Sequence, residues 1–234
     1  MTTTSTPIDA APLADEHRLT PQQVAFFETF GFVRLPGVFA DIADRLTEGF
    51  EEVFAENPTW DTNVDLHFEQ KRSIIAAFIT KSPKLESLLE DPRVVGIVSS
   101  LLGPDWEYAE SDGNLFYCDT SWHSDIYAAP MEQYHLKLSF YLDRLTGPGD
   151  GAIRMIPGTN WYEDPYASRL RGDLIDPAAV ERNFGVHPRD VPSWTLQSEP
   201  GDVIVWNFRT IHGSFGGGQR RRLFSVNFRQ PVAD

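Results

Sequence analysis

The spacing of hydrophobic residues along the chain changes near residue 105. Before that point the helical period is clearest in segment 40–57, where Ile42, Leu46, Phe50 and Phe54 fall on one side of a helix. Beyond it, aromatic and β-branched runs are broken by Gly and Pro, which is typical of strands. The pattern predicts a mostly helical part followed by a mostly β part.

Helix-capping residues refine the first part. Thr20 precedes Pro21 and has Gln23 three positions later, which is the pattern of a capped helix start, and Gly31 is a typical helix end. A short strand is expected directly afterwards, in the run FVRLP. Further helix boundaries are expected at Ser82-Pro83 and Asp91-Pro92, which are starts, and at Gly103, which is a stop.

The β part contains several runs with strand character, namely WEYAESDGNLFYC, YHLKLSFYLDRL, GAIRMIPG, SWTLQSEPGDVIVWNF and RRLFSVNFRQ. One helical insertion, DPAAVERNF from Asp176, interrupts them. Because the strands come in series, they favour a sandwich or barrel over a parallel sheet. We expect one domain over 17–234, with helical support over 17–105 and the β core over 106–230, after a flexible tail over 1–16.

The charge balance narrows the classes of function. A formal net charge of −14, from 34 acidic against 20 basic residues, argues against nucleic acid or an anionic membrane surface as a general partner. The sequence has no basic, apolar leader and no run of about 18 apolar residues, so a soluble cytoplasmic protein is expected. A single cysteine, Cys118, excludes an internal disulfide and a thiolate-rich zinc or iron–sulfur site.

The stretch SWHSDIY places a histidine and a carboxylate two positions apart. On an extended strand His123 and Asp125 would point to the same face, although so short a pattern also occurs by chance on a solvated strand. A third candidate ligand, His212, lies far downstream before a glycine run. Two histidines plus one carboxylate, with open positions opposite, form the facial triad of non-haem Fe(II) oxygenases, and the metal interpretation is therefore favoured.

The residues after His212 predict a hairpin. His212 and Arg221 are separated by the glycine run, so a turn there would fold Arg221 back beside His212 on a paired strand. On that second strand Arg221, Leu223, Ser225 and Asn227 would share one face. An arginine near a metal site supplies a planar, two-pronged donor, which is the anchor that a dicarboxylate co-substrate needs.

The motifs WHSD, DGAIRMIPGT and HGS with a trailing arginine resemble the phytanoyl-CoA dioxygenase (PhyH) family of Fe(II)/2-oxoglutarate-dependent oxygenases, in particular its ectoine hydroxylase-type members. The likeness runs from about residue 20 to about residue 230. It implies a double-stranded β-helix, which is a cupin-like jelly-roll barrel with helices packed on one side. It also implies that His123, Asp125 and His212 are the metal ligands.

By the same resemblance, three residues would bind the 2-oxoglutarate co-substrate. Arg221 matches the arginine that binds the distal carboxylate, and Ser214 matches a hydroxyl that often assists it. Asn114 sits where some members contact the same molecule. The segment between His212 and the arginine is shorter than in many members of the family, so Arg220 and Arg222 remain alternatives to Arg221.

The family activity implies the cofactors Fe(II), 2-oxoglutarate and dioxygen, and the release of succinate and carbon dioxide while a small-molecule metabolite is oxidised. Halogenating relatives replace the metal-binding carboxylate with a small residue, and Asp125 is intact. The resemblance therefore implies hydroxylation, desaturation or ring formation instead of halogenation. Substrate contacts are expected from Tyr127, Tyr134, His135 and Lys137, although the strand face of the last two could equally be solvated.

Two other classes of function stay open. A zinc-dependent hydrolase could use the same three ligands, although no general-base motif such as HExxH accompanies them, and the barrel could also be a non-catalytic small-molecule binding module. Only the oxygenase requires 2-oxoglutarate. Other candidates receive ordinary interpretations: surface or loop positions for His17, His67 and His187, packing for Trp122, and a structural role for Arg154.

Overall fold

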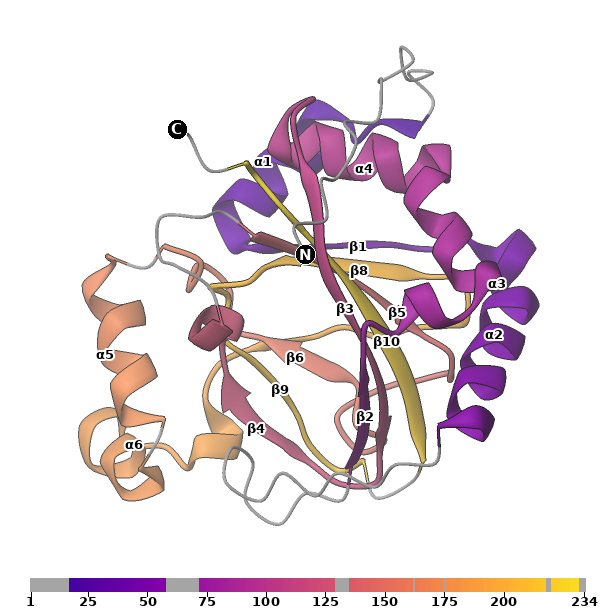
Figure 1. The fold of residues 1–234 in the computed structure, drawn as a ribbon. Helices are drawn as coiled ribbons and strands as arrows, with labels where there is room; N and C mark the ends of the chain where they lie inside the picture. The colour runs from indigo at the N-terminus through magenta and orange to yellow at the C-terminus, as the bar shows by residue number, and fades with distance from the viewer. Residues whose placement is uncertain are drawn as a thin grey trace.

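Two antiparallel sheets face each other at the centre of the protein, with helices on their outer sides (Figure 1). The computed structural model describes residues 17–57, 72–128, 135–161, 163–174, 176–217 and 220–231. The tail expected over 1–16 lies outside these ranges, as does His67. Within the described ranges, every helix is too short or too polar to cross a lipid bilayer.

The N-terminal helices begin where the capping residues indicate. At α1 (Pro21–Phe30), the Thr20 hydroxyl accepts a hydrogen bond from Gln23 N at 3.2 Å, and the Gln23 side chain accepts one from Thr20 N at 2.8 Å. Gly31 ends the helix with a φ of 84°. The following helices, in which η marks a 3₁₀ helix, are η2 (Ala40–Ile42), α2 (Ala43–Glu56), η3 (Ile79–Lys81), α3 (Pro83–Glu86), η4 (Ser87–Glu90) and α4 (Pro92–Leu102).

The β core has the predicted jelly-roll arrangement. Among the described residues, the larger sheet has six strands in the order β1-β8-β5-β10-β3-β2, and the smaller sheet has four in the order β4-β9-β6-β7. From β3 onward the chain passes back and forth between the two sheets. The strands are β1 (Phe32–Leu35), β2 (Arg72–Ala76), β3 (Glu107–Phe116), β4 (Thr120–His123), β5 (His135–Tyr141), β6 (Ile153–Met155), β7 (Trp194–Thr195), β8 (Val203–Asn207), β9 (His212–Ser214) and β10 (Arg221–Arg229).

Helices cover the outer faces of both sheets. Phe50 of α2 and Val94 of α4 are buried in the same apolar cluster as Phe224 of the larger sheet. On the opposite side of the molecule lie α5 (Pro165–Asp173), α6 (Pro177–Phe184) and η6 (Pro188–Asp190) (Figure 1). Leu170 of α5 packs in a cluster with Trp122 of the smaller sheet. The inner faces of the sheets are thereby left to line the space between them.

The hairpin prediction is wrong. His212 lies on β9, which pairs with β4 and β6 in the smaller sheet, whereas Arg221 lies on β10, which pairs with β3 and β5 in the larger sheet. The glycine-rich connection leads the chain from one sheet to the other because a turn signal does not specify which strands then pair. The elements β2, α5, η3 and η6 have no counterpart among the sequence-based expectations, and Asp125, expected on an extended strand with His123, opens the 3₁₀ helix η5 (Asp125–Ala128) instead.

Candidate metal and co-substrate site

His123, Asp125 and His212 converge at one point on the smaller sheet. His123 ends β4 and pairs with His212 at the start of β9, and Asp125 opens η5 (Asp125–Ala128). One possible ligand atom from each residue lies within 4.8 Å of the other two. The Nε2 atoms of His123 and His212 are 3.9 Å and 3.8 Å from the carboxylate oxygens of Asp125. Three ligand atoms on one side of a common centre are the facial arrangement that a non-haem iron site needs.

Backbone carbonyls orient both imidazole rings. His123 Nδ1 donates to the Ser121 carbonyl at 2.8 Å, and His212 Nδ1 donates to the Thr210 carbonyl at 2.9 Å. Since a carbonyl oxygen only accepts, these contacts fix the tautomer in which Nε2 carries the lone pair. Burial, together with the neighbouring charge of His212, lowers the pKa of His123 to about 3. The His123 ring is therefore neutral at physiological pH, as a metal ligand must be.

Asp125 is held as a carboxylate by groups from the larger sheet. Burial alone would raise the pKa of Asp125, but the Lys137 ammonium and the two histidines outweigh it and hold that pKa below its usual range. Lys137 Nζ lies 3.2 Å from Asp125 Oδ2, and Trp206 Nε1 donates to the same oxygen at 3.2 Å. The carboxylate is thus ionised and fixed in direction.

A cavity of about 310 Å³ lies between the two sheets and reaches the three candidate ligands. Its wall on the larger sheet includes the predicted β10 face, with Arg221, Leu223, Ser225 and Asn227. The β5 face that carries His135, Lys137 and Tyr141 also lines the cavity, so that face is not a solvated one.

Arg221 is the arginine that enters this cavity. Its side chain is 4% exposed, and Nη1 donates to the Gly151 carbonyl at 2.6 Å and to the Ser214 hydroxyl at 2.9 Å, while Nη2 donates to the Cys118 carbonyl at 2.6 Å. A Cβ atom added at Gly151 would come within 2.7 Å of Arg221 Nε, and one at Gly217 within 2.6 Å. The two glycines therefore leave the space that the guanidinium occupies.

The neighbouring arginines point elsewhere. Arg220 pairs with Glu51 at 2.7 Å, and Arg222 pairs with Glu51 at 2.9 Å and with Asp143 at 2.5 Å. Alternation along β10 places the Arg222 side chain on the face opposite Arg221, and Arg220 precedes the strand. Of the three arginines, Arg221 is the one that lines the cavity, and its role as the 2-oxoglutarate anchor stays a prediction.

Of the other residues predicted to contact co-substrate or substrate, some line the cavity and some fall outside what the structure describes. Ser214 and Asn114 are buried and line the cavity, the former on β9 and the latter on β3. His135 and Lys137 line it from β5. The backbone of Tyr127 is in η5, but its side chain falls outside what the structure describes, as does the whole of Tyr134.

Several cavity residues were not anticipated. Trp206 contacts Asp125 across the sheets, and nothing in the apolar run VIVWN signals that contact. Arg72 lines the cavity from β2, a strand that the sequence did not reveal. Asp112 also lines it, and here a signal existed, because Asp112 lies two residues before Asn114 on one strand.

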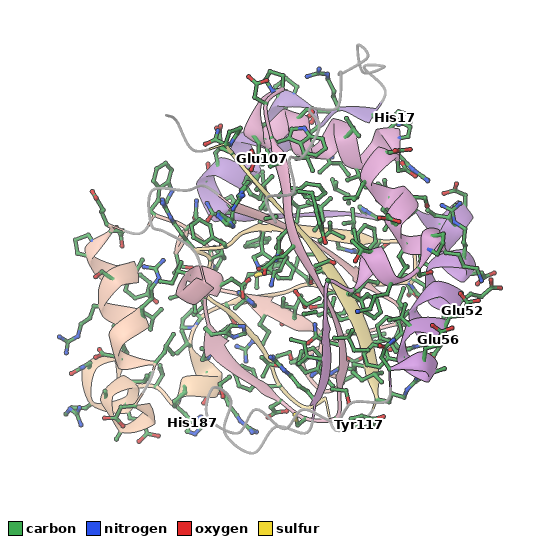
Figure 2. The ribbon with its side chains drawn as sticks, viewed as in Figure 1. His17, Glu52, Glu56, Glu107, Tyr117 and His187 are labelled. Carbon is green, nitrogen blue, oxygen red and sulfur yellow. The ribbon has the colours of Figure 1, made fainter. Side chains whose placement is uncertain are left out.

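Trp122, Arg154, His17 and His187, which were expected to have no part in the site, lie where that expectation puts them. Trp122 is 7% exposed, packs edge-on against Phe215 and donates from Nε1 to a backbone carbonyl. Arg154 donates to the Arg189 carbonyl at 2.6 Å and to the Ser193 hydroxyl at 2.9 Å, which is a structural role. His17 and His187 lie at the periphery, away from the space between the sheets (Figure 2).

Comparison with known proteins places the chain in a family. The profile of the family described as phytanoyl-CoA dioxygenase (PhyH) matches residues 27–223. No curated protein sequence matches the chain significantly. Similar solved structures include the non-haem α-ketoglutarate-dependent carbocyclase SnoK from nogalamycin biosynthesis, with a TM-score of 0.73 and 19% identity over 94% of this chain and 87% of that one.

Two further structures share the fold. HygX from Streptomyces hygroscopicus, solved with nickel and 2-oxoglutarate, has a TM-score of 0.69 and 18% identity over 92% of this chain and 88% of that one. EctD from S. alaskensis, solved with 2-oxoglutarate and 5-hydroxyectoine, has a TM-score of 0.67 and 20% identity over 96% of this chain and 81% of that one. The family profile, which spans most of the sequence, supports the assignment independently of these structures. The chain belongs to the phytanoyl-CoA dioxygenase (PhyH) family.

Proposed function

We propose that the protein is an Fe(II)/2-oxoglutarate-dependent dioxygenase that oxidises an unactivated C–H bond of a small-molecule metabolite. The observation that carries the proposal is the convergence of His123, Asp125 and His212 on a cavity whose other end holds the buried guanidinium of Arg221. Family membership supports it, as do the iron and 2-oxoglutarate named in the structures of related fold.

The side chains fit both groups. Two imidazole nitrogens and one carboxylate are borderline-to-hard ligands that suit Fe(II), and a facial set leaves positions for a chelating co-substrate. Arg221 provides a fixed fork for the distal carboxylate of 2-oxoglutarate. Its Nε atom is buried and, among the described residues, has no hydrogen-bond partner. A buried donor without an acceptor costs free energy, and an arriving carboxylate oxygen would satisfy it.

When bound, Fe(II) and 2-oxoglutarate together activate dioxygen, with release of succinate and carbon dioxide. The chain itself positions the reactants. Arg221, which donates to Ser214, would hold the co-substrate carboxylate together with that hydroxyl, while Lys137 and Trp206 fix the Asp125 carboxylate. The enclosed position of the site between two sheets limits access of water, and the inner strand faces hold the substrate close to the metal.

The test is an anaerobic titration. Fe(II) and 2-oxoglutarate are added to the metal-free protein without oxygen, and the weak visible charge-transfer band of chelated 2-oxoglutarate is recorded. We expect a band in the wild type, no band in His123→Ala, and a requirement for far more 2-oxoglutarate in Arg221→Ala. Arg220→Ala, which removes a neighbouring arginine outside the cavity, should behave as the wild type. Bound metal without a band would refute the proposal and favour a zinc enzyme or a binding module.

The type of oxidation is read from the product. Two of the solved structures of related fold are α-ketoglutarate-dependent enzymes of other kinds, a carbocyclase and an epimerase, so oxidation in this fold is not limited to hydroxylation. Because Asp125 occupies a ligand position, we propose hydroxylation, desaturation or ring formation for this protein. A product that gains one oxygen atom indicates the first, and a product that loses two hydrogen atoms indicates one of the others.

A further inference from the structure

The inner face of β3 carries two carboxylates that the proposed metal and co-substrate contacts do not use. Asp112 and Glu110 line the cavity on the opposite side of the metal site from Arg221. Arg221 is paired with Phe116, and Asp112 is four residues further along β3, which corresponds to about 13 Å. Lys137 Nζ lies 3.8 Å from Asp112 Oδ1 and 3.2 Å from Asp125 Oδ2, so Asp112 is beside the metal ligands. This end of the cavity is where a substrate would meet the metal.

Alternation along β3 places Glu110 on the same face as Asp112, and a β-bulge directly before Glu110 turns Tyr108 to the other face. In the pairing of β3 with β10, Asn227 is opposite Glu110 and Phe228 is opposite Tyr108, so Ala109 has no opposite residue. A bulge of this kind re-aims the flanking side chains. Tyr108 accordingly packs against Phe228 in the outer cluster, at 6.4 Å between ring centroids, while Glu110 faces the cavity.

Next to the two carboxylates, the side-chain amide oxygens of two asparagines receive no hydrogen bond within the described residues. Asn114 Nδ2 donates to Asp112, and Asn227 Nδ2 donates to Glu110 Oε1 at 3.1 Å. Exchanging amide oxygen and nitrogen would set each oxygen against a carboxylate, so the bonds fix both orientations. Asn114 is 3% and Asn227 6% exposed, and within the described part of the chain neither Oδ1 atom receives a hydrogen bond.

This end of the cavity has an excess of negative charge as well as an excess of hydrogen-bond acceptors, and both favour a cationic N–H donor. A divalent metal would balance Asp125 and part of the co-substrate, and Arg221 would balance the rest. Arg72, the other arginine in the lining, is opposite Phe116 at the Arg221 end of the cavity. At the other end Glu110 and Asp112 therefore share the cation Lys137, and one negative charge is in excess among these three side chains. A ligand that supplied both positive charge and N–H donors would satisfy the carboxylates and the two amide oxygens together.

We propose that the substrate carries a protonated amine, which binds between Asp112 and Glu110 with Asn227 as an additional acceptor. This inference rests on the proposed function, because it takes the metal site as the place of reaction. A neutral alcohol would meet the acceptors but not the charge, and a carboxylate would be repelled by both acidic groups. The amine fixes one end of the substrate and so determines which C–H bond reaches the metal.

The experiment compares three probes that share one ring and differ in charge: cyclohexylammonium, cyclohexanol and cyclohexanecarboxylate. Their binding to the protein loaded with Zn(II) and saturating 2-oxoglutarate is measured by ligand-observed NMR, so neither oxygen nor turnover is needed. The variants are Asp112→Asn, Glu110→Gln and Glu107→Gln. Glu107 is on the same strand but is not a cavity residue; it pairs with Arg229 at 3.1 Å and lies at the edge of the molecule (Figure 2).

Each variant removes one charge, so the control corrects for general attraction of cations to an acidic protein. We expect cyclohexylammonium to bind best of the three, with a Kd about tenfold higher in Asp112→Asn and about threefold higher in Glu110→Gln, but changed less than twofold in Glu107→Gln. Equal Kd values in all four proteins, or tighter binding of cyclohexanecarboxylate, would overturn the inference. If Asp112→Asn does not fold, Glu110→Gln, whose altered side chain is exposed, decides in its place.

The visible band with Fe(II) and 2-oxoglutarate separates the two proposals. A band combined with binding that ignores Asp112 and Glu110 removes the amine inference alone. Binding that depends on Asp112 without a band supports a cation site and removes the oxygenase.

Discussion

Arg221 on the larger sheet donates a hydrogen bond to the hydroxyl of Ser214 on the smaller sheet, over 2.9 Å. The bond crosses the space between the sheets at the end of the cavity away from Asp112 and Glu110. It places the guanidinium, which sits on one wall, against a hydroxyl that lies two residues after His212 on the other. The two walls are thus aligned at the point where a co-substrate carboxylate would bind.

Arg221→Lys should weaken binding of 2-oxoglutarate by about ten- to a hundredfold, because lysine cannot form the two-pronged contact and charge-assisted hydrogen bonds contribute roughly 1.5–3 kcal/mol each. The 2-oxoglutarate dependence of the visible band measures this. Arg220→Lys is the matched control, since Arg220 pairs with Glu51 outside the cavity. An unchanged affinity in Arg221→Lys would show that the carboxylate binds elsewhere.

Trp206→Phe should lower the affinity for Fe(II) by about ten- to a hundredfold, which is the usual effect of losing a hydrogen bond that orients a metal ligand. The substitution keeps an aromatic ring at a position 2% exposed and removes the donor to Asp125 Oδ2. Metal titration under anaerobic conditions gives the affinity. If the affinity stays within twofold of the wild type, Trp206 is only a packing residue.

Gly113→Ala should destabilise the protein by about 1–3 kcal/mol through overpacking. A Cβ atom at Gly113 of β3 would lie 2.2 Å from the ring of Phe78, which is fully buried. Gly172→Ala in α5 is the control, because a Cβ there meets nothing within 4 Å and alanine is the better helix former. Urea unfolding should therefore shift the two variants in opposite directions.

Asp91 should make stability depend on pH in the acidic range. Burial would raise the pKa of Asp91, but hydrogen bonds from the Arg93 side chain and backbone outweigh it and hold that pKa below its usual value. A carboxyl group whose pKa is lower in the folded state stabilises the protein above its unfolded pKa, which is about 3.9, and loses that effect as the pH falls through the folded pKa.

Wild type should therefore be more stable than Asp91→Asn at pH 7, by about 0.5–1 kcal/mol for a partly solvated pair. The difference should shrink below the unfolded pKa as Asp91 is protonated. Urea unfolding of both proteins at pH 7 and at a pH below the unfolded pKa gives the difference in unfolding free energy at each pH. The same difference at both pH values would contradict a role for the ion pair with Arg93.

Sequence patterns revealed the local features of this protein better than the pairing of distant segments. Strand alternation places Arg221 and Asn227 on one face, and both side chains line the cavity. The Thr20 cap likewise depends on neighbouring residues alone, and α1 begins there. Such features depend on residues that are close together along the chain, so the amino-acid sequence is enough to predict them.

The features that sequence missed depend on contacts between segments far apart. The glycine run indicated a turn, but whether the next strand pairs with β9 or enters the other sheet depends on the whole barrel. The hydrogen bond from Trp206 to Asp125 joins residues 81 positions apart and leaves no spacing pattern. In α5, Asp164 and Pro165 are a helix start of the same type as Asp91 and Pro92, but few apolar residues follow them.

All three candidate metal ligands come from the smaller sheet and η5, whereas the carboxylates and amides proposed to bind the substrate come from the larger sheet. The candidate metal ligands and the proposed substrate contacts therefore lie on different walls, and the larger sheet also carries Arg221, which would bind the co-substrate, and Lys137 and Trp206, which fix Asp125. A lineage can exchange the inward residues Glu110 and Asp112 of β3, and so acquire a new substrate, while the strands that bind the metal keep their sequence.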